Sequence, residues 1–155
     1  MTTTTSRIDV EQAAPELYRA MLRLDGAVGK SGLDPQLQDL LKFRVAQMNG
    51  CAYCMDMHGR DAVTAGERPE RLYVVAGWRE APFFSERERA ALRWAELVGQ
   101  IPQTDPGDAA FAALKEHFSD EEIAALGFTI VVITSWNLLN VSFRNPVPLE
   151  GPYVA

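Results

Sequence analysis

The chain has 155 residues, 47% of them hydrophobic, which suits one compact domain whose core needs no disulfide or metal. It is acidic, with 21 Asp and Glu against 15 Lys and Arg, and no basic stripe with interleaved aromatic residues is present, so nucleic acid is not an expected partner. The first residues, MTTTTSRIDVEQ, lack the basic and apolar regions of a signal peptide, and we therefore expect a cytoplasmic protein.

Apolar residues recur at helical spacing through most of the chain. In the segment PELYRAMLRLDGAVGK they stand at i, i+4, i+7 and i+11 from Leu17. The next segment, DPQLQDLLKFRVAQMNG, begins with the capping residue Asp34 and with Pro35, and it ends at Asn49-Gly50, a pair suited to a left-handed turn. These signals predict two helices, the second of which stops just before the first cysteine.

Five further helices are predicted. In chain order they are about Cys51 to Ala65, the segment RPERLYVVAGW, the segment that follows a capping box at Ser85 and Glu88, a short segment around Phe111 to Phe118, and the run that follows a second capping box at Ser119 and Glu122. No alternating strand pattern or internal repeat occurs. We therefore expect an all-α protein, and the number of apolar helices in so short a chain favours an oligomer.

The run from Ile123 to Phe143 carries no charged residue and is long enough to span a bilayer. It also contains glycine, threonine, serine and asparagine, which lower its hydropathy and suit packing between helices. We expect a helix buried on nearly all sides inside the protein, and no membrane association.

Both cysteines lie in the segment QMNGCAYCMDMHGRD. If Cys51 is in the first turn of a helix, Cys54 at i+3 and His58 at i+7 share its face. The positive end of the helix dipole favours thiolate at one of the two cysteines, and the imidazole can accept or transfer a proton. A thiolate that attacks a peroxide becomes a sulfenic acid, the second cysteine condenses with it, and an external dithiol must then reduce the disulfide. The same arrangement would also serve disulfide exchange without peroxide.

Two other interpretations of this segment remain open. The cysteines can be small buried residues with no chemistry. A metal site is the other alternative. Structural zinc usually needs four ligands, and the chain offers only His117 as a further imidazole. The three local ligands with Asp56, Asp61 or water are unusual for structural zinc and would suit catalytic zinc. A thioredoxin-type fold is disfavoured because helical patterns flank the motif on both sides.

The segment LQDLLKFRVAQMNGCAYCMDMHGRDAVTAGE closely resembles the core of the carboxymuconolactone decarboxylase superfamily, in its AhpD-like alkylhydroperoxidase branch. The later segments SERERAALRWAELV and DEEIAALGFTIVVITSWN are similar to the same family, so the resemblance covers most of residues 15 to 145 of a single domain. It implies an all-helical fold that forms dimers, trimers or hexamers, and peroxide reduction by the cysteine pair in antioxidant defence.

The resemblance also implies a role for each site residue. Cys54 matches the cysteine that attacks the peroxide, Cys51 the resolving cysteine, and His58 the histidine of a proton relay. The relay acid is a glutamate in the best-studied branch and corresponds here to Asp39, which is one methylene shorter. Tyr53 stands where some members have histidine, and it could contact a peroxide oxygen or simply pack. For the Trp136-Asn137 pair, core packing with a satisfied amide is preferred.

From these patterns we expect a thiol peroxidase with no bound metal or flavin, which uses a hydroperoxide and an external dithiol reductant. Better-studied relatives use a lipoylated protein as that reductant. Two other functions stay open: a redox-sensing protein whose cysteine pair forms a regulatory disulfide without turnover, and a metal-dependent or lactone-processing enzyme.

Overall fold

All regular secondary structure is helical in residues 5–101 and 103–148, the part of the chain that the computed structural model describes. This confirms the expected fold class. The helices are α1 (Val10–Ala13), α2 (Pro15–Gly29), α3 (Pro35–Met48), α4 (Ala52–Thr64), α5 (Pro69–Val74), the 3₁₀ turn η1 (Val75–Gly77), α6 (Glu86–Val98), α7 (Gly107–Lys115) and α8 (Asp120–Phe143).

The helix boundaries follow the sequence signals. Both predicted capping boxes form, before α6 and before α8: in each, the serine side chain accepts from the backbone N–H of the glutamate three residues on, whose carboxylate accepts from the serine N–H. Asp34 caps α3 by accepting from the backbone of Gln36. Most predicted helix limits are therefore confirmed to within a residue or two. The exception is α7, which begins four residues and ends three residues earlier than the predicted segment from Phe111 to Phe118, and the short helix α1 was not predicted.

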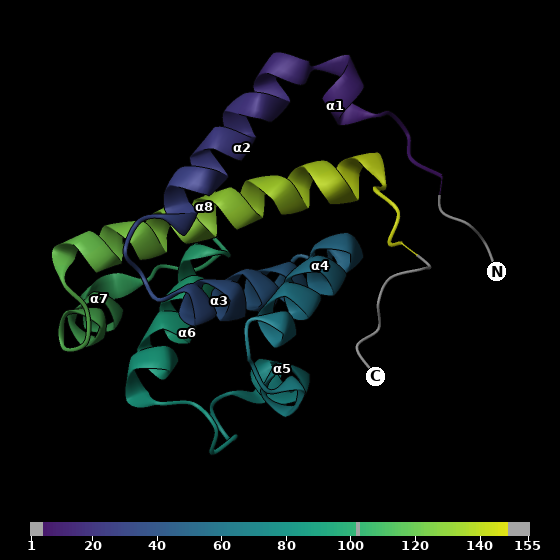
Figure 1. Ribbon diagram of the computed structural model, residues 1–155. Coiled ribbons are helices and arrows are strands. Elements are labelled where there is room, and N and C mark those ends of the chain that lie inside the picture. The colour runs from purple at the N-terminus through teal and green to yellow at the C-terminus, as the bar shows by residue number, and fades with distance from the viewer. Residues whose placement is uncertain (1–4, 102, 149–155) are drawn as a thin grey trace.

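Helix α8 is the longest element and organises the fold (Figure 1). It packs against α3 and α4 on one side and against α2 on the other, while α6 and α7 lie below its N-terminal half. The core between α3, α6 and α8 is apolar, and Leu41, Val45, Leu92, Leu126 and Ile130 are each no more than 2% exposed. Burial of this layer fixes the position of α3, and with it the start of α4.

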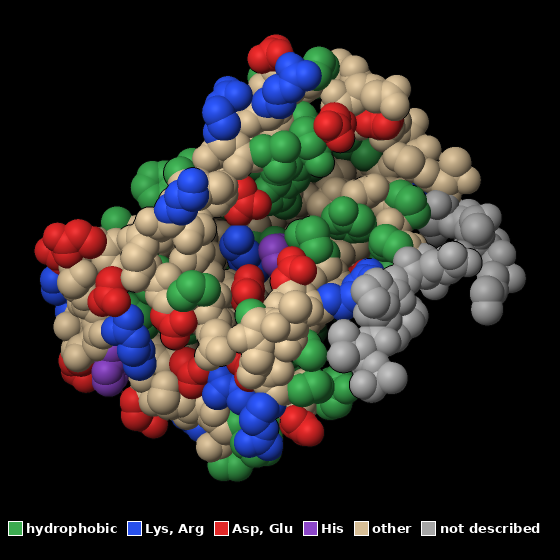
Figure 2. Space-filling view, viewed as in Figure 1, with side chains coloured by type: hydrophobic (Ala, Val, Ile, Leu, Met, Phe, Trp, Pro, Cys, Tyr) green, Lys and Arg blue, Asp and Glu red, His purple; other side chains and the backbone are tan. Residues whose placement is uncertain are grey.

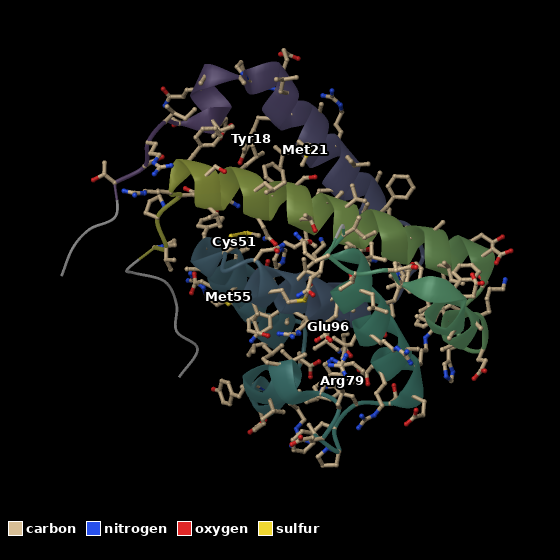
Figure 3. All side chains as sticks on the ribbon, turned by 180° about the vertical axis from the view of Figure 1, so that it is seen from behind. Tyr18, Met21, Cys51, Met55, Arg79 and Glu96 are labelled. Atoms are coloured by element: carbon tan, nitrogen blue, oxygen red, sulfur yellow. A yellow bond between two sulfur atoms is a disulfide. The ribbon has the colours of Figure 1, made fainter. Side chains whose placement is uncertain are left out.

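A partly buried carboxylate joins α3 to α6. Glu96 accepts from Arg44 at 2.8 Å, from the indole of Trp78 at 3.0 Å and from Arg79 at 2.8 Å (Figure 3). Burial alone would raise the pKa of Glu96, but these hydrogen bonds lower it below its usual value. The carboxylate is therefore ionised and fully partnered where α3 meets α6.

The expectation that the uncharged run is buried on nearly all sides is wrong. Phe128, Val131, Leu138 and Val141 of α8 are between 47% and 65% exposed. They lie on the side of α8 that no other described helix covers, because only one side of a helix can face the core of a single small chain. By length and composition α8 could cross a membrane, but this is weak evidence because core helices of soluble proteins pass the same test.

Candidate active site

The two cysteines lie where α3 turns into α4. Gly50, with a φ of 65°, takes the left-handed conformation that reverses the chain after α3. Cys51 is then the N-cap of α4, and its sulfur accepts from the backbone N–H of Cys54 at 3.3 Å. The two cysteines form a disulfide with their Cα atoms 5.3 Å apart, and each is 1% exposed. Figure 3 shows this bond at Cys51, where α4 passes beneath α8.

Cys54 lies on the wall of a cavity of about 140 Å³ between α2, α4 and α8. Each helix contributes one face. From α2 these are Tyr18, Leu22 and Asp25, from α4 Tyr53, Cys54, Met57 and His58, and from α8 Trp136 and Asn140, with Asn145 just beyond its end. Three predicted site residues, Tyr53, Cys54 and His58, are therefore together, while Cys51 is covalently joined behind them.

The sulfur of Cys54 has a polar partner from α8. The side-chain amide nitrogen of Asn140 lies 3.3 Å from it, within hydrogen-bond reach of sulfur. Asn140 was predicted only as one of the polar residues that dilute the hydropathy of α8. The structure places it in direct contact with the disulfide-bonded cysteine pair.

His58 is buried beside Cys54, 6% exposed, and its Nδ1 has no hydrogen-bond partner. Burial is the main cause that lowers the pKa of His58 to about 4; the positive charge of Lys42 lowers it further, and the carboxylate of Asp25 opposes the shift. At neutral pH the imidazole is therefore uncharged with the disulfide closed.

The structure brings Asp25 to the cavity, an acid that the sequence reasoning missed. Its carboxylate accepts from Lys42 at 3.0 Å and from the indole N–H of Trp136 at 3.2 Å, and its charge acts on His58. Asp39 is not among the residues that line this cavity. It is half-buried in α3, and burial raises the pKa of its carboxyl, with the nearby Lys42 opposing.

Trp136 differs from the expected core packing, whereas Asn137 packs in the core but without the expected satisfied amide. Trp136 lines the cavity and binds Asp25, and its ring meets Tyr18 edge to face at 5.3 Å. Asn137 is 1% exposed and accepts from Asn49 at 3.0 Å, but its own amide nitrogen has no partner. The amide is only half satisfied, because its nitrogen is enclosed where α8 crosses the end of α3.

A second cavity, of about 320 Å³, continues from the first toward the N-terminal segment. The two share Tyr18, Tyr53, Trp136, Asn140 and Asn145. The larger cavity adds apolar side chains of α8 and the carboxylates of α1. Figure 2 shows the hollow between α2 and α8, with hydrophobic side chains along it and acidic side chains near α1. The larger cavity therefore lies next to the smaller one, whose wall includes Cys54.

Helical spacing places the missed residues on one face of each helix, but it does not by itself mark that face as part of a site. Tyr18, Leu22 and Asp25 stand at i, i+4 and i+7, and so do Trp136, Asn140 and Phe143. Each series combines an aromatic residue with a polar one: the carboxylate of Asp25 can bind a proton, and the amide of Asn140 can donate to an anion. Within the residues that the structure describes, no three His, Cys, Asp or Glu side chains gather in a way that could hold a metal ion.

Comparison with known proteins agrees with this geometry. Residues 15–97, which include α2, both cysteines and His58, match the model of the carboxymuconolactone decarboxylase family. The chain belongs to this family. A relative in Bacillus subtilis, the uncharacterized protein YdfG, is 34% identical over 139 residues, which cover 90% of the present chain and 95% of YdfG.

Several solved structures have the same fold as this chain. Atu0492 from Agrobacterium tumefaciens, a protein of unknown function provisionally assigned to antioxidant defence as AhpD, superposes with a TM-score of 0.92 at 38% identity, over 94% of this chain and 100% of that one. An alkylhydroperoxidase AhpD core protein from Ralstonia eutropha superposes at 0.80 with 23% identity, over 91% and 75% of the two chains. The debrominase Bmp8 superposes at 0.80 with 19% identity, over 89% and 74%. The last two likenesses concern the fold alone.

Proposed function

We propose that this protein is a cytoplasmic thiol peroxidase that reduces organic hydroperoxides in antioxidant defence, with Cys54 as the attacking and Cys51 as the resolving cysteine. One observation carries the proposal: the sulfur of Cys54, bonded to Cys51, faces a cavity that it shares with His58. Family membership and the fold shared with AhpD-type proteins support it.

The reaction balances with these two sulfurs and one dithiol. The Cys54 thiolate attacks the outer oxygen of the hydroperoxide, the O–O bond breaks, and the alkoxide leaves as an alcohol after taking a proton. Cys54 is then a sulfenic acid. The Cys51 thiolate attacks its sulfur, hydroxide leaves as water after protonation, and the disulfide closes. An external dithiol restores both thiols and is itself oxidised to a disulfide.

His58 moves the protons in this scheme. His58 lines the cavity with Cys54 and can relay the thiol proton to the leaving alkoxide. Its lowered pKa makes the imidazole a weak base and the imidazolium a ready proton donor to the alkoxide. Two carboxylates can assist it. Asp39 is the acid that the family resemblance implies, and Asp25 is the acid that lines the cavity and whose charge acts on His58.

The cavities indicate the kind of substrate. Tyr18, Tyr53 and Trp136 offer aromatic walls next to Cys54, and Tyr53 lines both cavities, where its hydroxyl can reach a peroxide oxygen. Asp9 and Glu11 border the larger cavity and also contribute to raising the pKa of Tyr18, after burial. An uncharged organic hydroperoxide therefore fits this entrance better than one that carries a carboxylate.

The reductant is an external dithiol, because the scheme consumes two electrons per peroxide and needs no flavin or metal on the chain. A lipoylated protein, as in better-studied relatives, is one such dithiol. A disulfide-exchange or redox-sensing protein would use the same cysteine pair, and it differs in showing oxidation without repeated turnover when dithiol is supplied.

The deciding experiment is mass spectrometry of the reduced protein before and after one equivalent of cumene hydroperoxide. We expect a loss of two hydrogens per chain that maps to a Cys51–Cys54 disulfide, and stoichiometric cumyl alcohol. With excess dithiothreitol, turnover should continue in the wild type and stop in Cys54→Ser. Without dithiothreitol, Cys51→Ser should accumulate sulfenic and then sulfinic acid at Cys54. Full turnover in Cys54→Ser, or an unchanged mass after peroxide, would refute the proposal.

A further inference from the structure

The amide of Asn140 is held with its nitrogen toward the Cys54 sulfur. Its nitrogen lies 3.3 Å from that sulfur, and its oxygen accepts from the side-chain amide of Asn145 at 3.1 Å. Because the oxygen has its own donor, the nitrogen is left to face the sulfur. The amide is therefore oriented as a donor to Cys54.

Asn145 reaches Asn140 because of the way α8 ends. Arg144, the C-cap, is left-handed with φ 55° and ψ 51°, and this turns the chain back on the helix. The backbone N–H of Asn145 then donates to the carbonyl of Asn140 at 2.9 Å. The side chains of the two asparagines meet as a result of this cap.

Without the contact from Asn140, the two thiols would differ in acidity, and the less acidic one would be the cysteine that faces the cavity. Cys51 accepts the N–H at the start of α4, so the helix N-terminus stabilises a thiolate at Cys51. Yet Cys54, and not Cys51, is among the residues that line the cavity beside His58. His58 is uncharged at neutral pH in the disulfide form and there supplies no positive charge. Cys54 needs a donor from elsewhere, and the amide of Asn140 is in place to be that donor.

We propose that Asn140 is a catalytic residue whose amide N–H donates to the Cys54 thiolate, and that Asn145 is a positioning residue that keeps this amide turned toward the sulfur. The role in peroxide attack rests on the proposed function. The contact itself has a consequence that does not: the Cys54 thiol should be more acidic with Asn140 present than without it.

The chain has only two cysteines, so each can be studied as a lone thiol. Cys51→Ser leaves Cys54, and Cys54→Ser leaves Cys51. In both backgrounds Asn140→Leu removes the donor at similar side-chain volume, and the thiol pKa is read from the pH dependence of alkylation by iodoacetamide. The Cys51 thiol is the matched control, since it is close by but accepts from the helix start instead.

We expect Asn140→Leu to raise the Cys54 pKa by about one unit, so that alkylation below the pKa slows about tenfold. The Cys51 pKa should move by no more than about a fifth of that. Asn140→Asp, which has the same shape and a negative charge, should raise the Cys54 pKa further. An unchanged Cys54 pKa in Asn140→Leu, or an equal shift of the Cys51 thiol, would overturn the proposal.

Asn145→Ala provides a second test in case loss of Asn140 prevents folding. Asn145 is exposed, so its replacement leaves the core intact. It should raise the Cys54 pKa in the same direction by a smaller amount, and no shift at all would count against Asn140. If the variants show these pKa shifts but the folded wild type never turns over peroxide, the proposed function is refuted. The role of Asn140 as a donor to the thiolate would still be supported.

Discussion

Burial of His58 links the candidate site to the pH dependence of stability. The unfolded chain has the ordinary histidine pKa of 6.5, whereas the folded protein has a pKa of about 4. Between these values the unfolded state binds more protons, so the free energy of unfolding falls as the pH drops from about 6.5 to about 4. Since one unit corresponds to about 1.4 kcal/mol, His58 contributes on the order of 3 kcal/mol to this loss.

Urea unfolding of the oxidised protein at pH 7.5 and at pH 4.5 tests this contribution. His58→Gln should lose less stability over the interval than the wild type does. The comparison between the two proteins is needed because Glu88 and Glu96, whose pKa values lie below normal, lose stabilising contacts in the same direction at the acid end. Equal losses in wild type and His58→Gln would contradict the assignment.

Asp25 and Asp39 can be distinguished by matched substitutions. Asp25→Asn keeps the size of the side chain but removes the charge that raises the pKa of His58, and we expect a loss of about tenfold in peroxide turnover. Asp39→Asn should cost less, because Asp39 does not line the cavity. Steady-state rates with cumene hydroperoxide and excess dithiothreitol measure both, and a larger loss in Asp39→Asn would favour the relay that the resemblance implies.

At the scale of elements, close packing of α3 against α4 sets the position of the site. A Cβ added to Gly59 would meet the ring of Phe43 at 3.1 Å, so α4 approaches α3 closely at the residue that follows His58. A larger residue there must displace the ring or the helix. The position of His58 thus depends on a glycine that itself has no chemistry.

Two glycine substitutions separate helix propensity from packing. Gly26→Ala, in α2 with nothing near the added Cβ, should stabilise the protein by about 0.5–1 kcal/mol. Gly59→Ala should gain less, because the contact with Phe43 offsets the propensity term, and Gly59→Val should destabilise by about 1–3 kcal/mol. Thermal or urea unfolding measures all three; equal stabilisation by both alanines would show that α3 and α4 are less tightly packed at this point.

At the scale of the whole molecule, the exposed apolar face of α8 is the feature that a single chain does not explain. Val131 and Leu138 are seven residues apart and 52% and 65% exposed, as in helices that pair along a seam. The resemblance implies an oligomer, and we predict that a second copy covers this face.

Light scattering coupled to size-exclusion chromatography tests this prediction. Leu138→Glu should reduce the mass to that of one chain, because a buried unpaired carboxylate would oppose association. Tyr73→Glu is the control, since Tyr73 is 79% exposed on α5, away from α8. A wild-type mass of one chain, or an oligomer that survives Leu138→Glu, would mean that copies of this chain do not meet through α8.

Features that depend on neighbours along the chain could be predicted from the sequence alone. Helix limits, both capping boxes and the shared face of Cys51, Cys54 and His58 follow from local spacing and hydrogen bonding, so they could be read before the structure was known. The motif around the cysteines also indicated the family. These are short-range properties, fixed within a few turns of one helix.

Contacts between different helices could be known only from the folded chain. Asp25 and Asn140 are far from Cys54 in sequence, and they reach its cavity because α2 and α8 pack on α4. The exposed side of α8 could not be predicted either, since an all-apolar helix has no pattern that tells its inner from its outer face. The physical reason is the same in both cases: side chains on different helices meet only after the core has chosen how those helices pack.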